Sequence, residues 1–135
     1  MVKIETTYQG QKHCLALHIP SNSTLETDAP KDNQGLGEKF SPTDLLATAL
    51  GTCILTTMAI VAERDQVDIK GTKLFVEKIM LDKPRKIGSL NMKIHLPKSI
   101  SEDYKRKLEQ SAQSCPVKKS LCEDILTPIE FFYDI

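Results

Sequence analysis

The sequence predicts an α+β fold, and two observations carry that prediction. Residues 45–62 include no charged side chain, which is typical of a long buried helix. The segments before and after this run alternate polar and apolar residues, as strands do. A length of 135 residues suits one domain, so we expect a single domain over residues 1–135.

Charge and composition exclude several classes of protein. Hydrophobic residues make up 40% and charged residues 27% of the chain, and 18 basic residues balance 18 acidic ones. This balance gives no basic excess for binding nucleic acid or an anionic membrane. The N-terminus alternates from its start and shows no secretory signal, so we expect a cytoplasmic protein. Structural disulfides are uncommon there, and the four cysteines should be free, catalytic or metal-binding.

The N-terminal part predicts a small sheet followed by a loop. Residues 2–9 and 12–19 alternate as a hairpin with a tight turn at 10–11, and a third strand is expected at 24–27. Residues 28–40 are rich in turn formers and form a long loop, which is often a functional feature in compact domains.

The central helix has three start signals. Ser41 can act as the N-cap, Pro42 fits the first helical position, and Asp44 places a carboxylate in the first turn. Because the helix is apolar on nearly every face, we expect it to be buried on nearly every face. Its threonines and glycine should make it too polar to span a membrane.

The C-terminal part predicts a second hairpin, two shorter helices and a last strand. Ser101 should cap the first of these helices, with Tyr104, Leu108 and Ala112 on its inner face. The expected elements are strands at 67–81 and 86–96, a helix that Ser101 opens and residues 114–116 break, a short helix from 116 to 121 or 122, and a strand at 125–135.

Zinc is the first alternative for the cysteines. Cys14, Cys53, Cys115 and Cys122 show no pair two to four residues apart, and no histidine lies near the last three. We therefore expect no metal site and no cofactor. His13, His18 and His95 fall on predicted strands and are interpreted as surface or partly buried residues.

Cys115 precedes Pro116 at the start of a short helix, with Lys118 and Lys119 in its first turn. A helix N-terminus and nearby ammonium groups lower the pKa of a thiol, so the pattern predicts a reactive cysteine. The alternative is a small residue at a helix junction.

Cys53 lies deep inside the predicted central helix, where cysteine usually packs as a small hydrophobe. The neighbouring Thr52, Thr56 and Thr57 make its surroundings more polar, although such hydroxyls often bond back to helix carbonyls. Both a functional and an inert Cys53 fit the sequence.

Two segments resemble the motifs of the OsmC/Ohr family, the osmotically inducible and organic hydroperoxide resistance proteins. Residues 41–53, Ser-Pro-Thr-Asp-Leu-Leu-Ala-Thr-Ala-Leu-Gly-Thr-Cys, resemble the run that leads into the family's reactive cysteine. Residues 114–121, Ser-Cys-Pro-Val-Lys-Lys-Ser-Leu, resemble its second, cysteine-proline-valine motif. Cys53 and Cys115 are 62 residues apart, close to the usual separation in the family.

The resemblance implies an OsmC-like fold, in which antiparallel sheets wrap a long central buried helix, and an intertwined homodimer. It also implies thiol-dependent reduction of hydroperoxides, often organic ones, in defence against oxidative stress. Cys53 would be the peroxidatic cysteine and Cys115 the resolving one, and a dithiol reductant would restore both.

The chain departs from the family pattern around the reactive cysteine. Family peroxidases place an arginine against the thiolate, but every arginine of this chain follows Cys53. Lys39, or less probably Lys12, is the nearest cationic substitute. The family glutamate corresponds to Thr43, with Asp44 one position later.

The altered residues keep two alternatives open. One is a non-enzymatic dimer of the same fold that binds a small ligand or senses redox state through its thiols. The other is a structural dimer whose buried thiols are inert.

Overall fold

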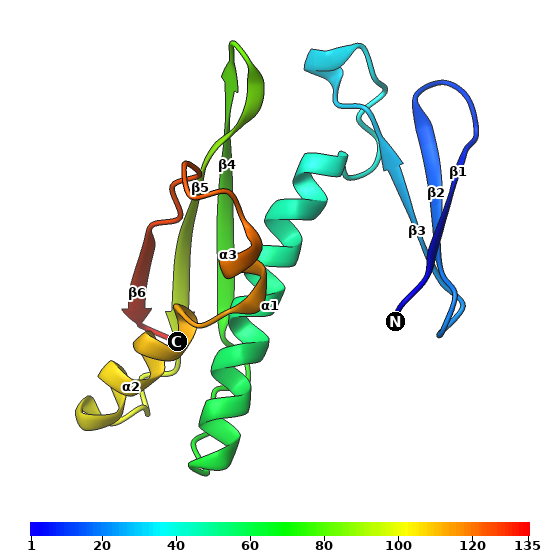
Figure 1. Ribbon diagram of the computed structural model, residues 1–135. Coiled ribbons are helices and arrows are strands. Elements are labelled where there is room, and N and C mark those ends of the chain that lie inside the picture. The colour runs from blue at the N-terminus through cyan, green and yellow to red at the C-terminus, as the bar shows by residue number, and fades with distance from the viewer. The chain divides into compact units, whose positions relative to one another are not determined.

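A computed structural model describes all residues, 1–135, and divides the chain into two compact units, residues 1–46 and 47–135 (Figure 1). The predicted succession of strands and helices is confirmed. The single domain stays a prediction. The elements are β1 (Ile4–Tyr8), β2 (His13–His18), β3 (Ser23–Asp28), the 3-10 turn η1 (Lys31–Asn33), α1 (Pro42–Arg64), β4 (Lys73–Asp82), β5 (Arg85–Leu96), α2 (Glu102–Ala112), α3 (Pro116–Ser120) and β6 (Ile129–Tyr133).

The first unit contains an antiparallel sheet of order β1-β2-β3. The predicted hairpin is confirmed, with Tyr8 opposite Cys14 across β1 and β2. Its turn is longer than the expected pair of residues. Gln11 and Lys12 both adopt positive φ, and the backbone N–H of Gln9 donates to the carbonyl of His13 at 2.9 Å.

The N-terminus of α1 has the reciprocal capping that the sequence predicts. The Ser41 hydroxyl accepts a hydrogen bond from the Asp44 backbone N–H at 3.1 Å. The Asp44 carboxylate in turn accepts from the Ser41 backbone N–H at 2.9 Å. Two N–H groups that lack a partner within the helix are satisfied in this way, which fixes where the helix begins.

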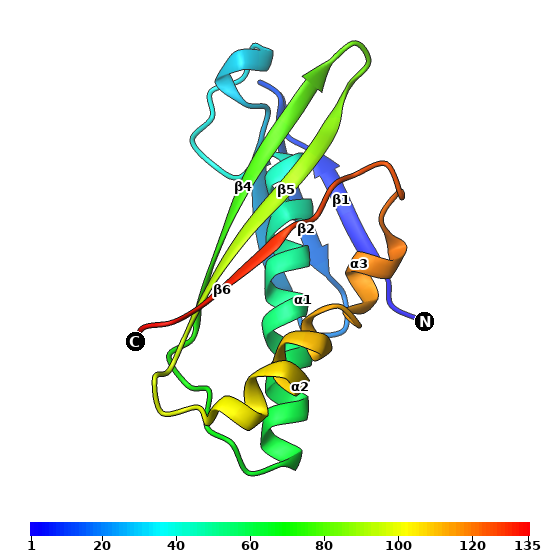
Figure 2. The ribbon, with the colours of Figure 1, turned by 90° about the vertical axis from the view of Figure 1, so that its left-hand side faces the viewer.

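The second unit has a mixed sheet of order β4-β5-β6. The predicted hairpin of β4 and β5 is confirmed, with Asp82 opposite Arg85. In contrast, β6 runs parallel to β5, so the expectation of antiparallel sheets is wrong for this strand. The reason is the connection: α2 and α3 form a crossover that returns the chain to the sheet in the direction of β5 (Figure 2).

The core of the second unit lies between this sheet and the helices. Side chains of α1, β5 and α2 and the thiol of Cys115 meet there. The fully buried large residues are Leu50, Ile54, Met58, Leu90, Met92, Ile94, Leu96 and Leu108. The predicted inner face of α2 is confirmed, with Leu108 and Ala112 buried and Tyr104 half-buried. Ser101 lies at the N-cap position of α2, but its side chain makes no capping hydrogen bond.

Only one face of α1 is buried. The buried positions recur every three or four residues, at Ala47, Leu50, Gly51, Ile54, Met58 and Ala62. The opposite face exposes Thr52, Thr56 and Ile60, of which Ile60 is 47% exposed. The expectation that α1 is buried on nearly every face is therefore wrong for one chain, because the core of its unit covers one side of the helix.

The hydropathy of α1 is also higher than expected. Its most apolar window of 18 residues has a mean hydropathy of 2.0, so by length and composition the helix could cross a membrane. The sequence argument that its threonines make it too polar is wrong, because the aliphatic residues outweigh them. A core helix of a water-soluble protein has the same composition.

Residues 67–72 do not form the predicted start of β4. Gln66 and Gly71 adopt positive φ, which an extended strand does not allow. The backbone N–H of Val67 instead donates to the Ala62 carbonyl at 2.8 Å and terminates α1. Val67 and Ile69 are half-buried, which accounts for the alternation that suggested a strand.

Candidate functional site

Two cysteines that are distant in sequence meet in the second unit. Cys53 lies half-buried on α1, and Cys115 is fully buried immediately before α3. Each thiol influences the pKa of the other, so the two side chains lie within interaction distance, and neither forms a disulfide. The structure therefore brings together the two thiols that the motifs singled out.

Cys115 owes its position to a sharp change of chain direction. It occupies the N-cap of α3, with Pro116 at the first helical position, as the sequence predicts. Its sulfur accepts a hydrogen bond from the Lys118 backbone N–H at 3.5 Å. This short turn also brings the backbone N–H of Val117 close enough to Cys53 to lower the pKa of that thiol.

Cys53 is the member of the pair that ionises more easily. Burial acts to raise its pKa, but hydrogen bonds from the Cys115 thiol, the Val117 N–H and the Thr57 hydroxyl outweigh burial, so the pKa is lowered. All three donors are neutral groups. Their effect is larger on a thiolate than on a thiol, because an ionised acceptor forms stronger hydrogen bonds.

Cys115 behaves in the opposite way from the prediction. Its burial and the neighbouring Cys53 raise its pKa, and the backbone N–H of Lys118 compensates only in part. The Lys118 ammonium, expected to lower the pKa of Cys115, donates a hydrogen bond to Gln113 and is not among the groups that shift that pKa. Cys115 does lie at the start of a helix, as predicted. Burial of the thiol in the core, however, affects its pKa more than the helix start does.

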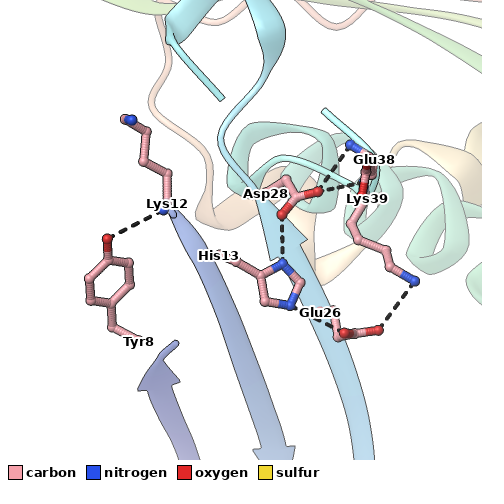
Figure 3. A network of polar contacts seen from close by, with 7 residues as sticks. All are labelled: Tyr8, Lys12, His13, Glu26, Asp28, Glu38 and Lys39. Atoms are coloured by element: carbon pink, nitrogen blue, oxygen red, sulfur yellow. Dashed lines mark hydrogen bonds and ion pairs between the residues drawn. The ribbon is translucent and has the colours of Figure 1, made fainter. Parts of the chain in front are cut away.

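Lys39, the expected cationic substitute, lies in a polar network of the first unit (Figure 3). Its Nζ is 3.2 Å from a carboxylate oxygen of Glu26. The other oxygen of Glu26 and the carboxylate of Asp28 contact the two ring nitrogens of His13, at 3.2 and 2.6 Å. Activation of a thiolate by Lys39 stays a prediction.

Asp28 ties the long loop to this sheet. It is almost fully buried, and one carboxylate oxygen accepts the backbone N–H groups of Glu38 and Lys39 at 3.0 and 3.1 Å. Together with the His13 contact, these bonds lower the pKa of Asp28. The loop of residues 28–40 is therefore an ordered segment anchored at both ends.

Thr43 and Asp44, the other residues expected to support the thiolate, belong to the first turn of α1. The Thr43 hydroxyl lies 3.1 Å from that of Ser41, and Asp44 completes the cap. Their predicted part in orienting a catalytic cation stays a prediction.

Sequence reasoning missed the influence of Thr57 and Val117 on the pKa of Cys53. The hydroxyl of Thr57 does bond back to the carbonyl of Cys53, at 2.8 Å, as such residues often do in helices. The spacing of four residues was the available signal for a contact with the thiol as well. Nothing in the sequence placed Val117 near Cys53, because that contact depends on packing of α3 against α1.

The two remaining cysteines are also free thiols. Cys14 is half-buried on β2, and Cys122 is exposed after α3. Cys122 hydrogen-bonds to the carboxylate of Asp124, which is also paired with the Lys86 ammonium. The chain brings together no group of three His, Cys, Asp or Glu side chains suited to a metal ion.

A cavity of about 450 Å³ lies at the C-terminal end of α1. Its walls combine apolar side chains with charged groups, a combination typical of small-molecule sites. The lining residues are Leu55, Ala59, Glu63, Val67, Asp68, Ile69, Lys70, Gly71 and Thr72.

The protein has an α+β fold with two sheets, and it places one thiol on a long helix beside a second thiol at the start of a short helix. These features define a class of thiol proteins. Within that class, the chain belongs to the OsmC-like protein family, whose family model matches residues 35–129. No curated protein matches the sequence.

Solved structures show the same fold over the whole chain. A Psychrobacter arcticus 273-4 protein named for osmotic stress induction and detoxification response is 40% identical, with a TM-score of 0.92, covering 97% of this chain and 96% of that one. An organic hydroperoxide resistance protein OsmC of Legionella pneumophila is 14% identical, with a TM-score of 0.79 and coverages of 98% and 96%. The organic hydroperoxide resistance protein OhrB of Bacillus subtilis is 16% identical, with a TM-score of 0.68 and coverages of 97% and 97%. The OsmC-like fold that the two motifs predicted is confirmed.

Proposed function

We propose that this protein is a cytoplasmic, thiol-dependent peroxidase that reduces organic hydroperoxides in defence against oxidative stress. The observation that supports the proposal is that Cys53 and Cys115 lie within interaction distance, the first thiol with a lowered pKa and the second with a raised one. A thiolate is the nucleophile in such reactions, and a neutral thiol beside it is suited to the second step.

In the first step, the Cys53 thiolate attacks the outer oxygen of the hydroperoxide. The O–O bond breaks, an S–O bond forms, and the alkoxide takes a proton and leaves as the alcohol. Cys53 is then a sulfenic acid. The Cys115 sulfur attacks the Cys53 sulfur, the S–O bond breaks, and one water is released as the disulfide forms. A dithiol then reduces the disulfide by exchange and is itself oxidised to a disulfide.

The proposal is tested by counting thiols. A Cys14→Ser, Cys122→Ser variant keeps only the thiol pair. One equivalent of cumene hydroperoxide should remove both free thiols per chain, and a dithiol reductant should restore them through repeated cycles. Adding Cys53→Ser should abolish the loss, whereas adding Cys115→Ser should leave a sulfenic acid that dimedone traps. A pair that keeps both thiols after peroxide treatment would contradict the proposal.

The neutral surroundings of Cys53 favour a second candidate, a redox sensor. Its sulfur is hydrogen-bonded to a thiol, a backbone N–H and a hydroxyl, which stabilise a thiolate less strongly than a guanidinium does. A sensor would lose two thiols to one equivalent of peroxide without sustained turnover under any dithiol reductant. The same assay therefore separates the two candidates.

The cavity at the end of α1 favours a further alternative, binding of a small, largely apolar ligand. This reading requires no thiol chemistry. An aliphatic fluorescent probe should then bind the parent protein and the Cys53→Ser variant equally well, and Ala59→Trp, which fills the cavity, should abolish binding.

A homodimer is also part of the proposal. The exposed face of α1 carries Thr52, Thr56 and Ile60 and no charge between Leu45 and Ala62, which is unusual for a helix surface in water. A second copy of the chain would cover this face.

A further inference from the structure

Asp28 closes the long loop that precedes α1. Its backbone N–H donates to the carbonyl of Phe40 at 3.1 Å, and one oxygen of its carboxylate accepts the backbone N–H groups of Glu38 and Lys39. The next residue, Ser41, already belongs to the cap of α1. One residue at the end of β3 therefore holds the last part of the loop, immediately before the central helix begins.

The carboxylate of Asp28 depends on His13 for a positive partner. Asp28 is only 3% exposed, and an anion buried to this extent is costly without a counter-charge. The His13 Nδ1 lies 2.6 Å from one oxygen of Asp28, and its Nε2 lies 3.2 Å from an oxygen of Glu26. The other oxygen of Glu26 lies 3.2 Å from the Nζ of Lys39. This series of contacts begins and ends on the loop and passes through the imidazole ring (Figure 3).

The ring satisfies both carboxylates only when it is protonated. An imidazolium has two N–H donors, whereas the neutral ring has one donor and one lone pair, which a carboxylate cannot satisfy. The charged groups that face the ring are Asp28 and Glu26 from β3, with Lys39 beyond Glu26. On the side of β1, the hydroxyl of Tyr8 accepts the backbone N–H of Lys12 at 3.3 Å, and the Lys12 ammonium points away from the ring (Figure 3).

Loss of the ring proton leaves this cluster with one uncompensated negative charge. The two carboxylates of Asp28 and Glu26 are balanced by Lys39 and a protonated His13. The neutral ring keeps a bond to one carboxylate and turns its lone pair towards the other, so an ion pair is replaced by repulsion. The hydrogen bond to Asp28 raises the pKa of His13, which places this change above the ordinary pKa of histidine.

We propose that His13 is a pH-dependent latch for the loop of residues 28–40: its protonated ring joins Asp28 to Glu26 and keeps residues 38–40 on β3, and loss of the proton loosens them. Because the pKa of His13 is raised in the folded protein, the loop is held firmly below the ordinary pKa of histidine. It loosens as pH rises through the raised pKa. Lys39 belongs to the loop, so the latch also determines how firmly its ammonium is held. The latch involves no thiol and is independent of the proposed peroxidase.

The test is amide hydrogen exchange followed by NMR across a series of pH values. Protection of the Glu38 and Lys39 amides, relative to an unstructured peptide at the same pH, should fall about three- to tenfold as pH rises through the His13 midpoint. This is the size expected when one charge-assisted hydrogen bond is weakened. Chemical shifts of the His13 ring in the same samples give the midpoint. The amide of Met58, in the buried part of α1, should show no step there.

Three variants assign the step to the latch. His13→Gln removes the titrating group but keeps a donor for Asp28, so protection should be low and should show no step. His18→Gln is the matched control, because His18 lies on the same strand and its Nδ1 contacts the hydroxyl of Ser21 at 2.6 Å instead of a carboxylate. This variant should keep the step. Glu26→Gln should reduce it, because an amide can donate to the lone pair of the neutral ring.

Equal protection of the Glu38 and Lys39 amides on both sides of the His13 midpoint would overturn the proposal, as would a step that persists in His13→Gln. The absence of protection at every pH would also overturn it. If the circular dichroism spectrum of His13→Gln differs from that of the parent, Glu26→Gln provides the test at a side chain that is 43% exposed. An undiminished step in that variant would count against the latch.

Discussion

The properties of the two central cysteines depend on their surroundings and not on their local sequence. Cys115 has the better local signals, with a helix start and two lysines after it, and yet its pKa is raised. Cys53 lies in the middle of a helix, where the dipole is ineffective, and its pKa is lowered. Burial and the donors from α3 account for the reversal. For Cys115, the sequence signals of a helix start therefore predicted the position of the thiol correctly, but not the direction of its pKa shift.

A polar cluster in the first unit joins His13 to Asp28 and Glu26. The sequence predicted only that His13 lies on a strand. Each ring nitrogen of His13 contacts a carboxylate, which favours the doubly protonated imidazolium. The hydrogen bond to Asp28 is the main cause that raises the pKa of His13 above 6.5, although burial opposes it. The same contact is the main cause that lowers the pKa of Asp28.

These directions predict a pH window for Asp28→Asn. The contribution of His13 is complete below the ordinary pKa of histidine and is lost as pH rises through its raised pKa in the folded protein. The contribution of Asp28 is complete above the ordinary pKa of aspartate and is lost as pH falls through its lowered pKa. Asp28→Asn should therefore lower Tm most between the ordinary pKa of aspartate and the ordinary pKa of histidine, and less as pH falls through the lowered pKa of Asp28 or rises through the raised pKa of His13.

The measurement is thermal unfolding of both proteins across a series of pH values. Glu5→Gln, which neutralises an exposed carboxylate on the adjacent strand β1, serves as the control and should change Tm little. A difference in Tm between Asp28→Asn and the parent that is the same at every pH would contradict the ionic role of the pair.

At the scale of elements, α1 is the most informative part of the chain. Its start was predictable, because capping is local chemistry between Ser41 and Asp44. Its buried face was not, because apolar residues surround the helix and no periodicity distinguishes one side. Gly51 marks the side that packs on the sheet: a Cβ atom there would lie 3.0 Å from Leu74 and 3.2 Å from Val76 of β4.

Met58 offers a direct test of that face. It is fully buried in the core of the second unit. Met58→Ala should lower the free energy of unfolding by about 2–5 kcal/mol, because it removes buried apolar volume and leaves a cavity. Urea unfolding followed by circular dichroism measures the change. Leu126→Ala, at a position that is 66% exposed, should cost less than about 0.5 kcal/mol. Equal losses in both variants would show that the buried face of α1 has been assigned to the wrong side.

Strands were predicted better in number than in extent or direction. The hairpins β1–β2 and β4–β5 follow from alternation and short turns, which are local signals. The segment 67–72 alternates too, but Val67 and Ile69 pack against the core from a turn and not from a strand. The direction of β6 depends on where the crossover through α2 and α3 returns the chain, and alternation within β6 carries no information on it.

At the scale of the whole molecule, the main feature is the apolar helix α1. Its mean hydropathy of 2.0 is too high to exclude a membrane by composition, and one of its faces is exposed in a single chain. Burial of that face by a second chain would reconcile both findings with the OsmC-like fold, since contiguous exposed apolar surface marks an interface.

Ile60→Glu tests this explanation. A charge in the middle of the exposed face of α1 should convert a dimer into monomers, because a carboxylate without a partner is costly to bury. Size-exclusion chromatography with light scattering should give the mass of two chains for the parent and of one for the variant. Leu126→Glu makes the same change at another exposed apolar position and should leave the mass unchanged. A parent protein with the mass of one chain would rule out the dimer.

The amino-acid sequence by itself determined the order of elements, the cap of α1 and the family, because each rests on neighbouring residues or on motifs that can be read directly. Tertiary structure alone decided that Cys53 and Cys115 lie within interaction distance, which of the two ionises more readily, which face of α1 is buried and in which direction β6 runs. The physical reason is that desolvation and hydrogen bonds between distant segments exist only after the chain has packed.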